Sequence, residues 1–118
     1  MKIFFLDDDA TRHKRFTMNR IGSDITQAWN YEEACRLLGE QVFDVAWLDH
    51  DLSYEATLGT QSVDEKTGTH VAEFIAAMPD DRRPRFVVLH TFNPAGRMRM
   101  LGILRAAGVG VAIEPFNG

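Results

Sequence analysis

Short apolar runs alternate with stretches of helical periodicity along this 118-residue chain. The runs that predict strands cover about residues 2–6, 24–29, 44–48, 85–90 and 110–113. Between them, helices are predicted at about residues 10–21, 31–39, 69–78 and 94–107. Because this alternation is typical of a parallel sheet with helices on both faces, we expect one α/β domain over residues 1–118. The sheet should be doubly wound and five-stranded, in the order 2-1-3-4-5.

Capping residues and apolar faces mark the predicted helices. Gly22 predicts the end of the first helix, and Asn30 with Glu33 forms a capping pair at the start of the second. Asn93 followed by Pro94 combines an N-cap residue with proline at the first helical position, so the fourth helix should begin there. The inner faces of the last two helices are expected to contribute core residues at Val71, Phe74, Ile75, Met78, Met98, Leu101 and Leu104.

Residues 53–67 show no clear period and form a long connection for a compact domain. The segment leaves the acidic end of the third predicted strand and returns at Thr67-Gly68. We interpret it either as a lid or pocket wall or as an insertion without a role in the site.

The composition is that of an ordinary globular domain, with 45% apolar and 25% charged residues. A net charge of −4 makes generic nucleic-acid binding unfavourable, because such binding requires a basic surface. Cys35 is the only cysteine, which excludes an internal disulfide and a cysteine metal cage. No stretch is apolar enough to span a membrane. Because the N-terminal residues predict a strand at once, we do not expect them to be a signal peptide. We therefore expect a cytoplasmic protein without membrane association; the sequence does not predict its oligomeric state.

Carboxylates follow two of the predicted strands. The first strand ends in Asp7-Asp8-Asp9, and the third ends in Asp49-His50-Asp51. In the expected strand order these strands are neighbours at the topological switch, where such sheets bind ligands. Five carboxylates brought together there would repel one another unless a cation or protons compensate. This pattern predicts a divalent-metal site that handles phosphate.

Oxygen ligands of this kind suit Mg²⁺ or Mn²⁺. We expect the metal ligands to be Asp8, Asp9, Asp49 and Asp51. Asp7 is the less favoured candidate, because it can still belong to the strand. The alternative is that the first acids only stabilise a helix N-terminus and that Asp51 only begins a turn.

A second set of polar residues lies at 90–97, after the fourth strand and at the start of a helix. Helix N-termini bind anions, so Thr91, Asn93 and Arg97 are candidate phosphate ligands. Arg12 is a further candidate that would contact either phosphate or the acids. His90 is expected to face Asp49 with a raised pKa and to act as a general acid or base, together with His50. The alternative for His50 is a packing role in the core.

Several of these residues resemble the receiver domain of two-component response regulators. The matching positions, in chain order, are Asp8, Asp9, Asp49, Gly68, Pro115 and Phe116. Two positions depart from that pattern. Receivers carry Ser or Thr at the end of strand four, where this chain has His90, and Lys before the Pro-Phe pair, where it has Glu114. Since receivers use that Lys to pair with a phosphoryl group, the resemblance implies that ordinary phosphorylation of Asp49 is impaired.

The chain is more similar to the cyclic-phosphate processing receiver-like family. The resemblance covers nearly the whole chain and rests on Leu6-Asp7-Asp8, 48–52, Thr67-Gly68 and 90–97, followed by Arg99-Met100. Val88 departs from the family, whose members often have a further histidine there. The resemblance implies a receiver-like, flavodoxin-like fold and a role on a cyclic phosphate, either a cyclic nucleotide or an RNA cyclic end.

Two other families use acids in similar patterns. Residues 7–11 fit the Asp-x-Asp-x-Thr of haloacid-dehalogenase-like phosphatases, and residues 49–51 fit the Asp-x-Asp of Toprim nucleases. The first needs a longer chain with a later Lys and acidic pair, and the second needs a Glu after strand one. Our first hypothesis is therefore a metal-dependent phosphoesterase whose ligand is a small phosphorylated molecule such as a cyclic nucleotide. The second is a non-catalytic atypical receiver that acts as a signalling or protein-interaction module.

Overall fold

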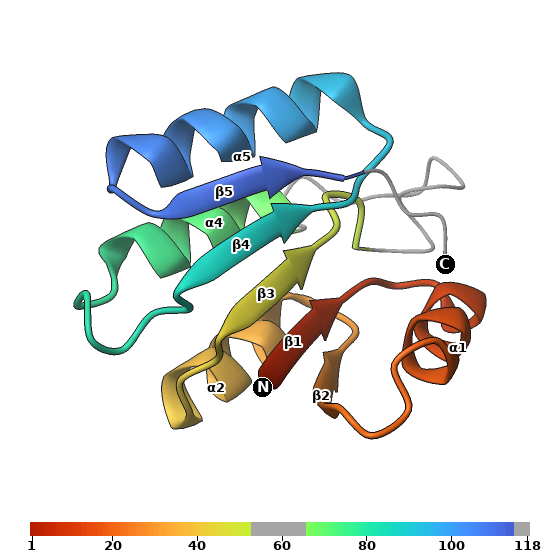
Figure 1. The fold of residues 1–118 in the computed structure, drawn as a ribbon. Helices are drawn as coiled ribbons and strands as arrows, with labels where there is room; N and C mark the ends of the chain where they lie inside the picture. The colour runs from red at the N-terminus through yellow and green to blue at the C-terminus, as the bar shows by residue number, and fades with distance from the viewer. Residues whose placement is uncertain (53–65, 115–118) are drawn as a thin grey trace.

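The computed structural model describes residues 1–52 and 66–114 as one parallel sheet with helices on both faces (Figure 1). The strands are β1 (Lys2–Leu6), β2 (Asp24–Ala28), β3 (Val45–Leu48), β4 (Phe86–Leu89) and β5 (Gly110–Ile113). They pair in the order β2-β1-β3-β4-β5, so the predicted fold class and strand order are confirmed. The helices are α1 (Ala10–Met18), α2 (Tyr31–Glu40), α4 (Gly68–Ala77) and α5 (Pro94–Ala106). None of the described helices is long and apolar enough to cross a lipid bilayer.

The two faces of the sheet carry cores of different size. Side chains alternate along β1, so Phe4 and Leu6 enter the larger core, with residues of α2, α4 and α5. Ile3 and Phe5 point the other way and form the smaller core with Phe16 of α1. The rings of Phe5 and Phe16 stack with centroids 4.0 Å apart. The sheet therefore separates α1 from the other three helices.

Two expectations about the helices were wrong. The first helix ends at Met18 rather than at residue 21, and Gly22, with a φ of 95°, lies in the turn that follows. Met98 is 58% exposed rather than buried, because the inner face of α5 carries Met100, Leu101 and Leu104. The lid or pocket wall predicted at 53–67 lies outside the described residues, apart from its last two, and so does the Pro115-Phe116 pair.

Side-chain caps fix where three helices begin beside the ends of the strands. The side chain of Asp9 accepts a hydrogen bond from the Arg12 amide at the start of α1, and Asn93 accepts one from Gly96 at the start of α5. At α4, the amide of Thr67 donates to Nδ1 of His70 over 3.0 Å, which completes a capping box with histidine in the place of the usual Glu or Gln.

Two glycines let α4 and α5 approach the end of β3 closely. The amide of Gly68 donates to the carbonyl of His50 over 2.8 Å, and a Cβ at Gly68 would collide with the Asp49 carbonyl. A Cβ at Gly96 would lie 2.8 Å from Nδ1 of the His50 ring. The segment after β3 is therefore held between the first turns of both helices, with its backbone against α4 and the His50 ring against α5.

We expect Gly68→Ala to lower the free energy of unfolding by at least about 2 kcal/mol, as clashes in a packed interior do. The contact is with backbone and cannot be relieved by a change of side-chain rotamer. Gly102→Ala is the matched control, because Gly102 lies inside α5 and a Cβ there meets no atom of the described residues within 4 Å. It should raise stability by about 0.5–1 kcal/mol. Urea denaturation of both variants measures the difference, and an equal effect at the two positions would contradict the packing described here.

Candidate functional site

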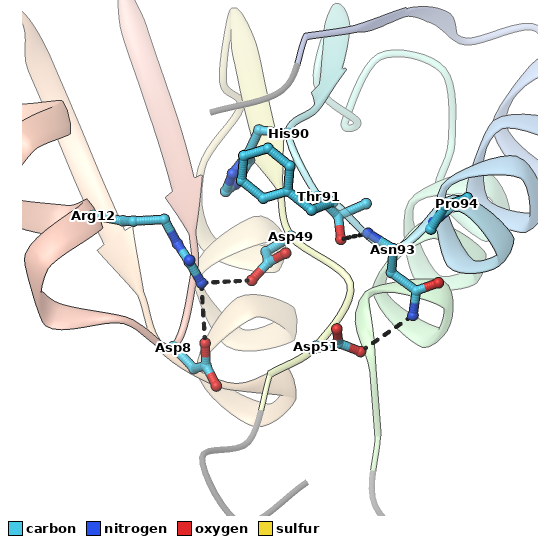
Figure 2. A pocket seen from close by; sticks show the side chains of 9 residues that line it. Asp8, Arg12, Asp49, Asp51, His90, Thr91, Asn93 and Pro94 are labelled. Atoms are coloured by element: carbon cyan, nitrogen blue, oxygen red, sulfur yellow. Dashed lines mark hydrogen bonds and ion pairs between the residues drawn. The ribbon is translucent and has the colours of Figure 1, made fainter. Parts of the chain in front are cut away.

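A cavity of about 370 Å³ lies at the carboxyl end of the sheet. Its lining comes from the segments that follow β1, β3 and β4 and from the first turn of α1: Asp8, Arg12, Asp49, Asp51, His90, Thr91, Phe92, Asn93 and Pro94 (Figure 2). The cavity thus lies across the switch between β1 and β3, where ligands bind in sheets of this order. Its size falls within the range of small-molecule sites.

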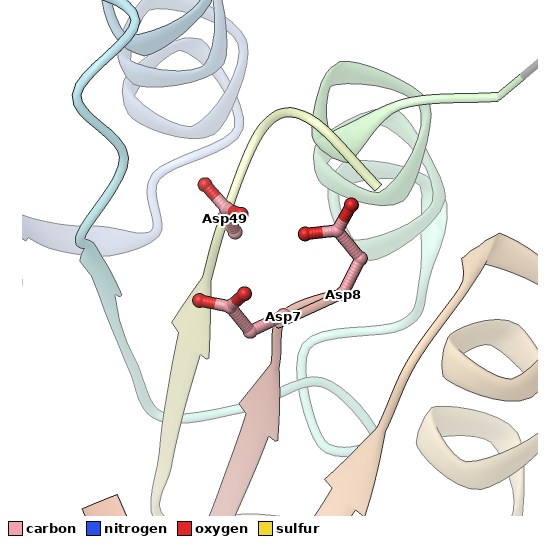
Figure 3. A group of neighbouring side chains, drawn as sticks. All are labelled: Asp7, Asp8 and Asp49. Atoms are coloured by element: carbon pink, nitrogen blue, oxygen red, sulfur yellow. The ribbon is translucent and has the colours of Figure 1, made fainter. Parts of the chain in front are cut away.

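Three carboxylates meet beside this cavity. Asp7 and Asp8 come from the end of β1 and Asp49 from the end of β3 (Figure 3). One oxygen of each lies within 4.8 Å of the others. Asp7 is fully buried and Asp49 nearly so. Three oxygen donors this close form a group that can hold a divalent cation.

This group differs in part from the predicted ligand set. It contains Asp8 and Asp49 as expected, but Asp7 stands where Asp9 was predicted. Oδ1 of Asp9 accepts from the Arg12 amide over 3.0 Å, so this carboxylate caps α1. Asp51 also lies outside the group, and its Oδ1 is 3.0 Å from Nδ1 of His50. Asp7 was the less favoured candidate because it can still belong to the strand. The alternation of side chains along a strand does not predict where the side chain after its last residue points.

Arg12 is the counter-charge of the three acids. Its Nε donates to Oδ2 of Asp7 over 2.8 Å. Its Nη2 lies 3.5 Å from Oδ2 of Asp49 and 3.7 Å from Oδ1 of Asp8. The sequence predicts that Arg12 contacts either phosphate or the acids, and the structure shows contacts with the acids. Burial acts to lower the Arg12 pKa, but the bond to Asp7 and the nearby carboxylates outweigh it, so the pKa is raised.

One guanidinium does not compensate three carboxylates. Burial raises the pKa of Asp49 to about 7, and the negative charge of Asp7 adds to this effect. Burial and Asp7 likewise raise the pKa of Asp8. Without a further cation, the folded chain thus favours a proton on these carboxyls. A divalent ion would displace that proton.

His90 lies at the end of β4, as expected. Its Nδ1 is 3.7 Å from Oδ2 of Asp7, and its Nε2 donates to the carbonyl of Leu6 over 3.1 Å. Burial lowers the pKa of His90 to about 4, although Asp7 acts to raise it. The expected rise was wrong because the residue is only 2% exposed, and desolvation of the imidazolium outweighs one nearby carboxylate.

His50 belongs to a polar cluster beside the cavity but does not line it. Its Nδ1 lies 3.0 Å from Oδ1 of Asp51 and 3.3 Å from Nδ2 of Asn93. Its Nε2 is buried and has no hydrogen-bond partner among the described residues. The backbone amide of His50 donates to Oδ1 of Asp49 over 2.8 Å, which orients that carboxylate. The residue therefore joins the acid group to the start of α5.

The predicted phosphate ligands occupy different places. Thr91 and Asn93 line the cavity, and the backbone amide of Asn93 donates to Oγ1 of Thr91 over 3.1 Å. Arg97 does not line it, and within residues 1–52 and 66–114 its buried Nε has no hydrogen-bond partner. Arg97 follows Gly96, so it lies on the turn of α5 that packs against His50.

His13 is a site residue that sequence analysis left without a role. It is buried, and its Nε2 donates to the carbonyl of Asp7 over 2.7 Å. The ring of Trp29 stacks on it with centroids 3.6 Å apart. His13 lies three residues before Phe16, on the inner face of α1, and that spacing is the signal that could have found it.

Comparisons with known proteins agree with this geometry. A family model described as "Cyclic-phosphate processing Receiver domain" matches residues 1–106. No curated protein matches the chain.

Among solved structures, the chain is similar to a response regulator from Burkholderia pseudomallei with a phosphorylated aspartic acid, a calcium ion and citrate. That likeness has 19% identity and a TM-score of 0.66, and covers 98% of this chain and 61% of that one. This chain therefore spans less than two thirds of that protein. The receiver domain of a Pseudomonas aeruginosa sensor histidine kinase, with magnesium in its active site cleft, has 19% identity and a TM-score of 0.67, with 98% and 86% covered.

The response regulator TrrA from Thermotoga maritima, in complex with Mg(2+)-BeF, has 20% identity and a TM-score of 0.67, with 98% of this chain and 88% of that one covered. At these identities the likenesses show the receiver fold alone.

The raised pKa of Asp49 predicts how stability depends on pH. A folded-state pKa of about 7, against an ordinary 3.8, means that stability is lost as the pH rises between these values. In a chelator, Asp49→Asn should therefore gain stability relative to the unsubstituted protein between pH 4 and pH 8, by an amount on the order of a few kcal/mol. Urea denaturation across this range measures the gain. Asp51→Asn is the control, since that side chain is 56% exposed, and should show no such gain. A pH-independent difference for Asp49→Asn would contradict the assignment.

Proposed function

The chain belongs to the cyclic-phosphate processing receiver domain family, and we propose that it binds and hydrolyses a cyclic phosphodiester in this cavity with the help of a divalent cation. The observation that carries the proposal is the group of Asp7, Asp8 and Asp49, which adjoins a cavity at the switch point of the sheet. Three carboxylates and one guanidinium leave an excess of negative charge in a place where a phosphate must bind. A bound divalent cation would neutralise this excess negative charge.

The residues fit Mg²⁺ or Mn²⁺. All three side chains offer hard oxygen donors. A magnesium site in a protein usually consists of a few carboxylates together with water molecules and the phosphate of the substrate. Burial first, and then the negative charge of Asp7, raise the pKa values of Asp8 and Asp49, and Arg12 only partly offsets this effect, so a further positive charge beside them would stabilise their ionised forms. Such an ion, when bound, polarises a phosphoryl oxygen or lowers the pKa of a water molecule.

Hydrolysis of a cyclic phosphodiester adds water across one P–O bond. The water oxygen bonds to phosphorus, the ring oxygen leaves and gains a proton, and the water gives up a proton to a base. We assign the role of that base to His90. Its pKa, lowered to about 4 by burial, keeps the ring neutral at pH 7 but makes it a weak base, and because its Nε2–H is bonded to Leu6, Nδ1 is the proton-accepting nitrogen. Nδ1 lies on the side of Asp7.

Other residues would hold the phosphate and shape the site. The N-terminus of α5, with Thr91 and Asn93, borders the cavity, and the helix dipole there favours an anion. Arg12 lines the same cavity and is partly exposed, so it can contact phosphate as well as the acids. For His50 we propose a positioning role, because it does not line the cavity but contacts Asp51 and Asn93.

One observation favours the alternative of a non-catalytic receiver that binds a ligand or a protein. His90 is 2% exposed and bonded to the backbone of β1, as a packing histidine would be. The decisive measurement is a turnover screen of cyclic mono- and dinucleotides and RNA 2′,3′-cyclic ends, with Mg²⁺ or Mn²⁺ and with chelator. Metal-dependent ring opening that Asp49→Asn abolishes supports the enzyme. Metal-dependent binding without turnover would establish the alternative.

We expect Mg²⁺ or Mn²⁺ to raise the Tm of the protein, because a ligand that binds only the folded state stabilises it. Asp8→Asn and Asp49→Asn should each remove most of that rise. Asp9→Asn is the matched control: asparagine caps a helix about as well as aspartate, and Asp9 lies outside the acid group. It should keep the rise. Differential scanning fluorimetry over a metal titration measures all four proteins. A full response in Asp49→Asn would overturn the metal site.

We also expect acetyl phosphate to leave Asp49 essentially unphosphorylated. Glu114 takes the place where phosphorylated receivers carry Lys, and its amide continues the β4–β5 ladder by donating to Leu89 over 2.9 Å. A carboxylate at the end of β5 cannot pair with a phosphoryl group as an ammonium does. Intact-protein mass spectrometry checks this prediction. A stoichiometric, acid-labile gain of one phosphoryl group, absent in Asp49→Asn, would place the chain among ordinary receivers.

A further inference from the structure

One large aromatic side chain stands open at the cavity. Phe92 lines it and is 64% exposed. The other aromatic ring of the described lining, that of His90, is buried and stacked on Phe5 with centroids 5.1 Å apart. Phe92 is thus the aromatic surface that this cavity offers to a ligand.

The backbone on both sides of Phe92 is fixed. Thr91 is buried, and its Oγ1 accepts a hydrogen bond from the backbone amide of Asn93. This bond closes a short turn that has Phe92 as its middle residue. The side chain of Asn93 in turn accepts from the Gly96 amide over 3.0 Å and caps α5. A ring held on such a turn loses little backbone freedom when a ligand contacts it.

The character of the remaining lining indicates which ligand could use this ring. Single exposed apolar residues are common and need no explanation by themselves. Here, however, the neighbours in the cavity are charged or polar, apart from Pro94: Asp8, Arg12, Asp49, Asp51, His90, Thr91 and Asn93. A ligand that satisfies both kinds of surface carries an anionic group and a flat apolar group. A nucleotide has both, because its base offers a π-face to an aromatic side chain.

We propose that Phe92 stacks on the nucleobase of the ligand and makes the site select cyclic nucleotides over cyclic phosphates without a base. This inference rests on the proposed function, since it takes the phosphate to lie over the acid group. Phe92 is then a specificity-determining residue with no part in the chemistry. Stacking tolerates different bases, so the selection concerns the presence of a base more than its identity.

The test measures affinity by titration calorimetry in Mg²⁺ for two pairs of probes, as Kd, or as KM for a compound that the protein turns over. One pair is adenosine 2′,3′-cyclic phosphate and glycerol 1,2-cyclic phosphate; the other is adenosine 3′,5′-cyclic phosphate and the base-free six-membered propane-1,3-diol cyclic phosphate. The unsubstituted protein should prefer the adenosine compound in at least one pair. Phe92→Ala should weaken binding of that compound by between about fivefold and a hundredfold and leave the base-free partner unchanged.

Matched variants separate stacking from general packing. Phe92→Trp should restore the preference, whereas Phe92→Leu, which is apolar but not aromatic, should restore only a small part of it. Met98→Ala removes another exposed apolar side chain of the same region, outside the cavity lining, and should change neither Kd. All four variants should keep their Tm within a few degrees, because both positions are exposed.

The outcomes distinguish this inference from the proposed function. If adenosine and base-free compounds bind equally well and Phe92→Ala changes neither, the stacking role is wrong while cyclic-phosphate binding stands. If Phe92→Ala weakens the binding of both members of a pair equally, the residue shapes the cavity and does not contact the base. If no cyclic phosphate binds in the presence of Mg²⁺, both proposals fall.

Discussion

Repulsion among three carboxylates is the constraint on which the rest of this site depends. Asp7, Asp8 and Asp49 are held together by the ends of two neighbouring strands, and Arg12 is the guanidinium that contacts all three. Burial of Asp49 makes the repulsion more costly, since charges interact more strongly away from water. The surrounding contacts keep these acids in place: His13 holds the Asp7 carbonyl, and the His50 amide holds the Asp49 carboxylate.

The fold was predictable because its signals are local and agree with one another. Apolar runs with turn residues between them located all five strands, and β-α alternation implied parallel pairing. The caps at Asn30 and Asn93 placed two helix starts correctly. The end of α1 was missed because a glycine in a turn resembles a helix cap in sequence, and Gly22 lies within the turn that follows the helix rather than directly after its last residue. Met98 was misplaced because one residue of offset moves a side chain by about 100° around a helix.

The site was predictable in its location and less so in its details. Strand order placed the acids of β1 and β3 side by side, but it did not distinguish Asp7 from Asp9, since that choice depends on which side chain caps α1. The pKa of His90 was expected to be raised because only the nearby acids were considered. The direction of the pKa shift depends instead on how far the folded chain shields the imidazole from water, which a sequence does not show. His13 likewise gains its role only when α1 packs on β1.

The packing of α1 carries a consequence for the dynamics of the molecule. This helix rests on the smaller core, with Phe16 as its fully buried apolar anchor, while α2, α4 and α5 share the larger one. Helices with few buried contacts open at lower free energy than the rest of a domain, and amide hydrogen exchange reveals them. Yet Asp9, Arg12 and His13 all belong to the first turn of α1 or its cap. A helix with a single fully buried apolar side chain therefore supplies the counter-charge of the acid group, so partial unfolding there and the electrostatic state of the cavity are thermodynamically coupled.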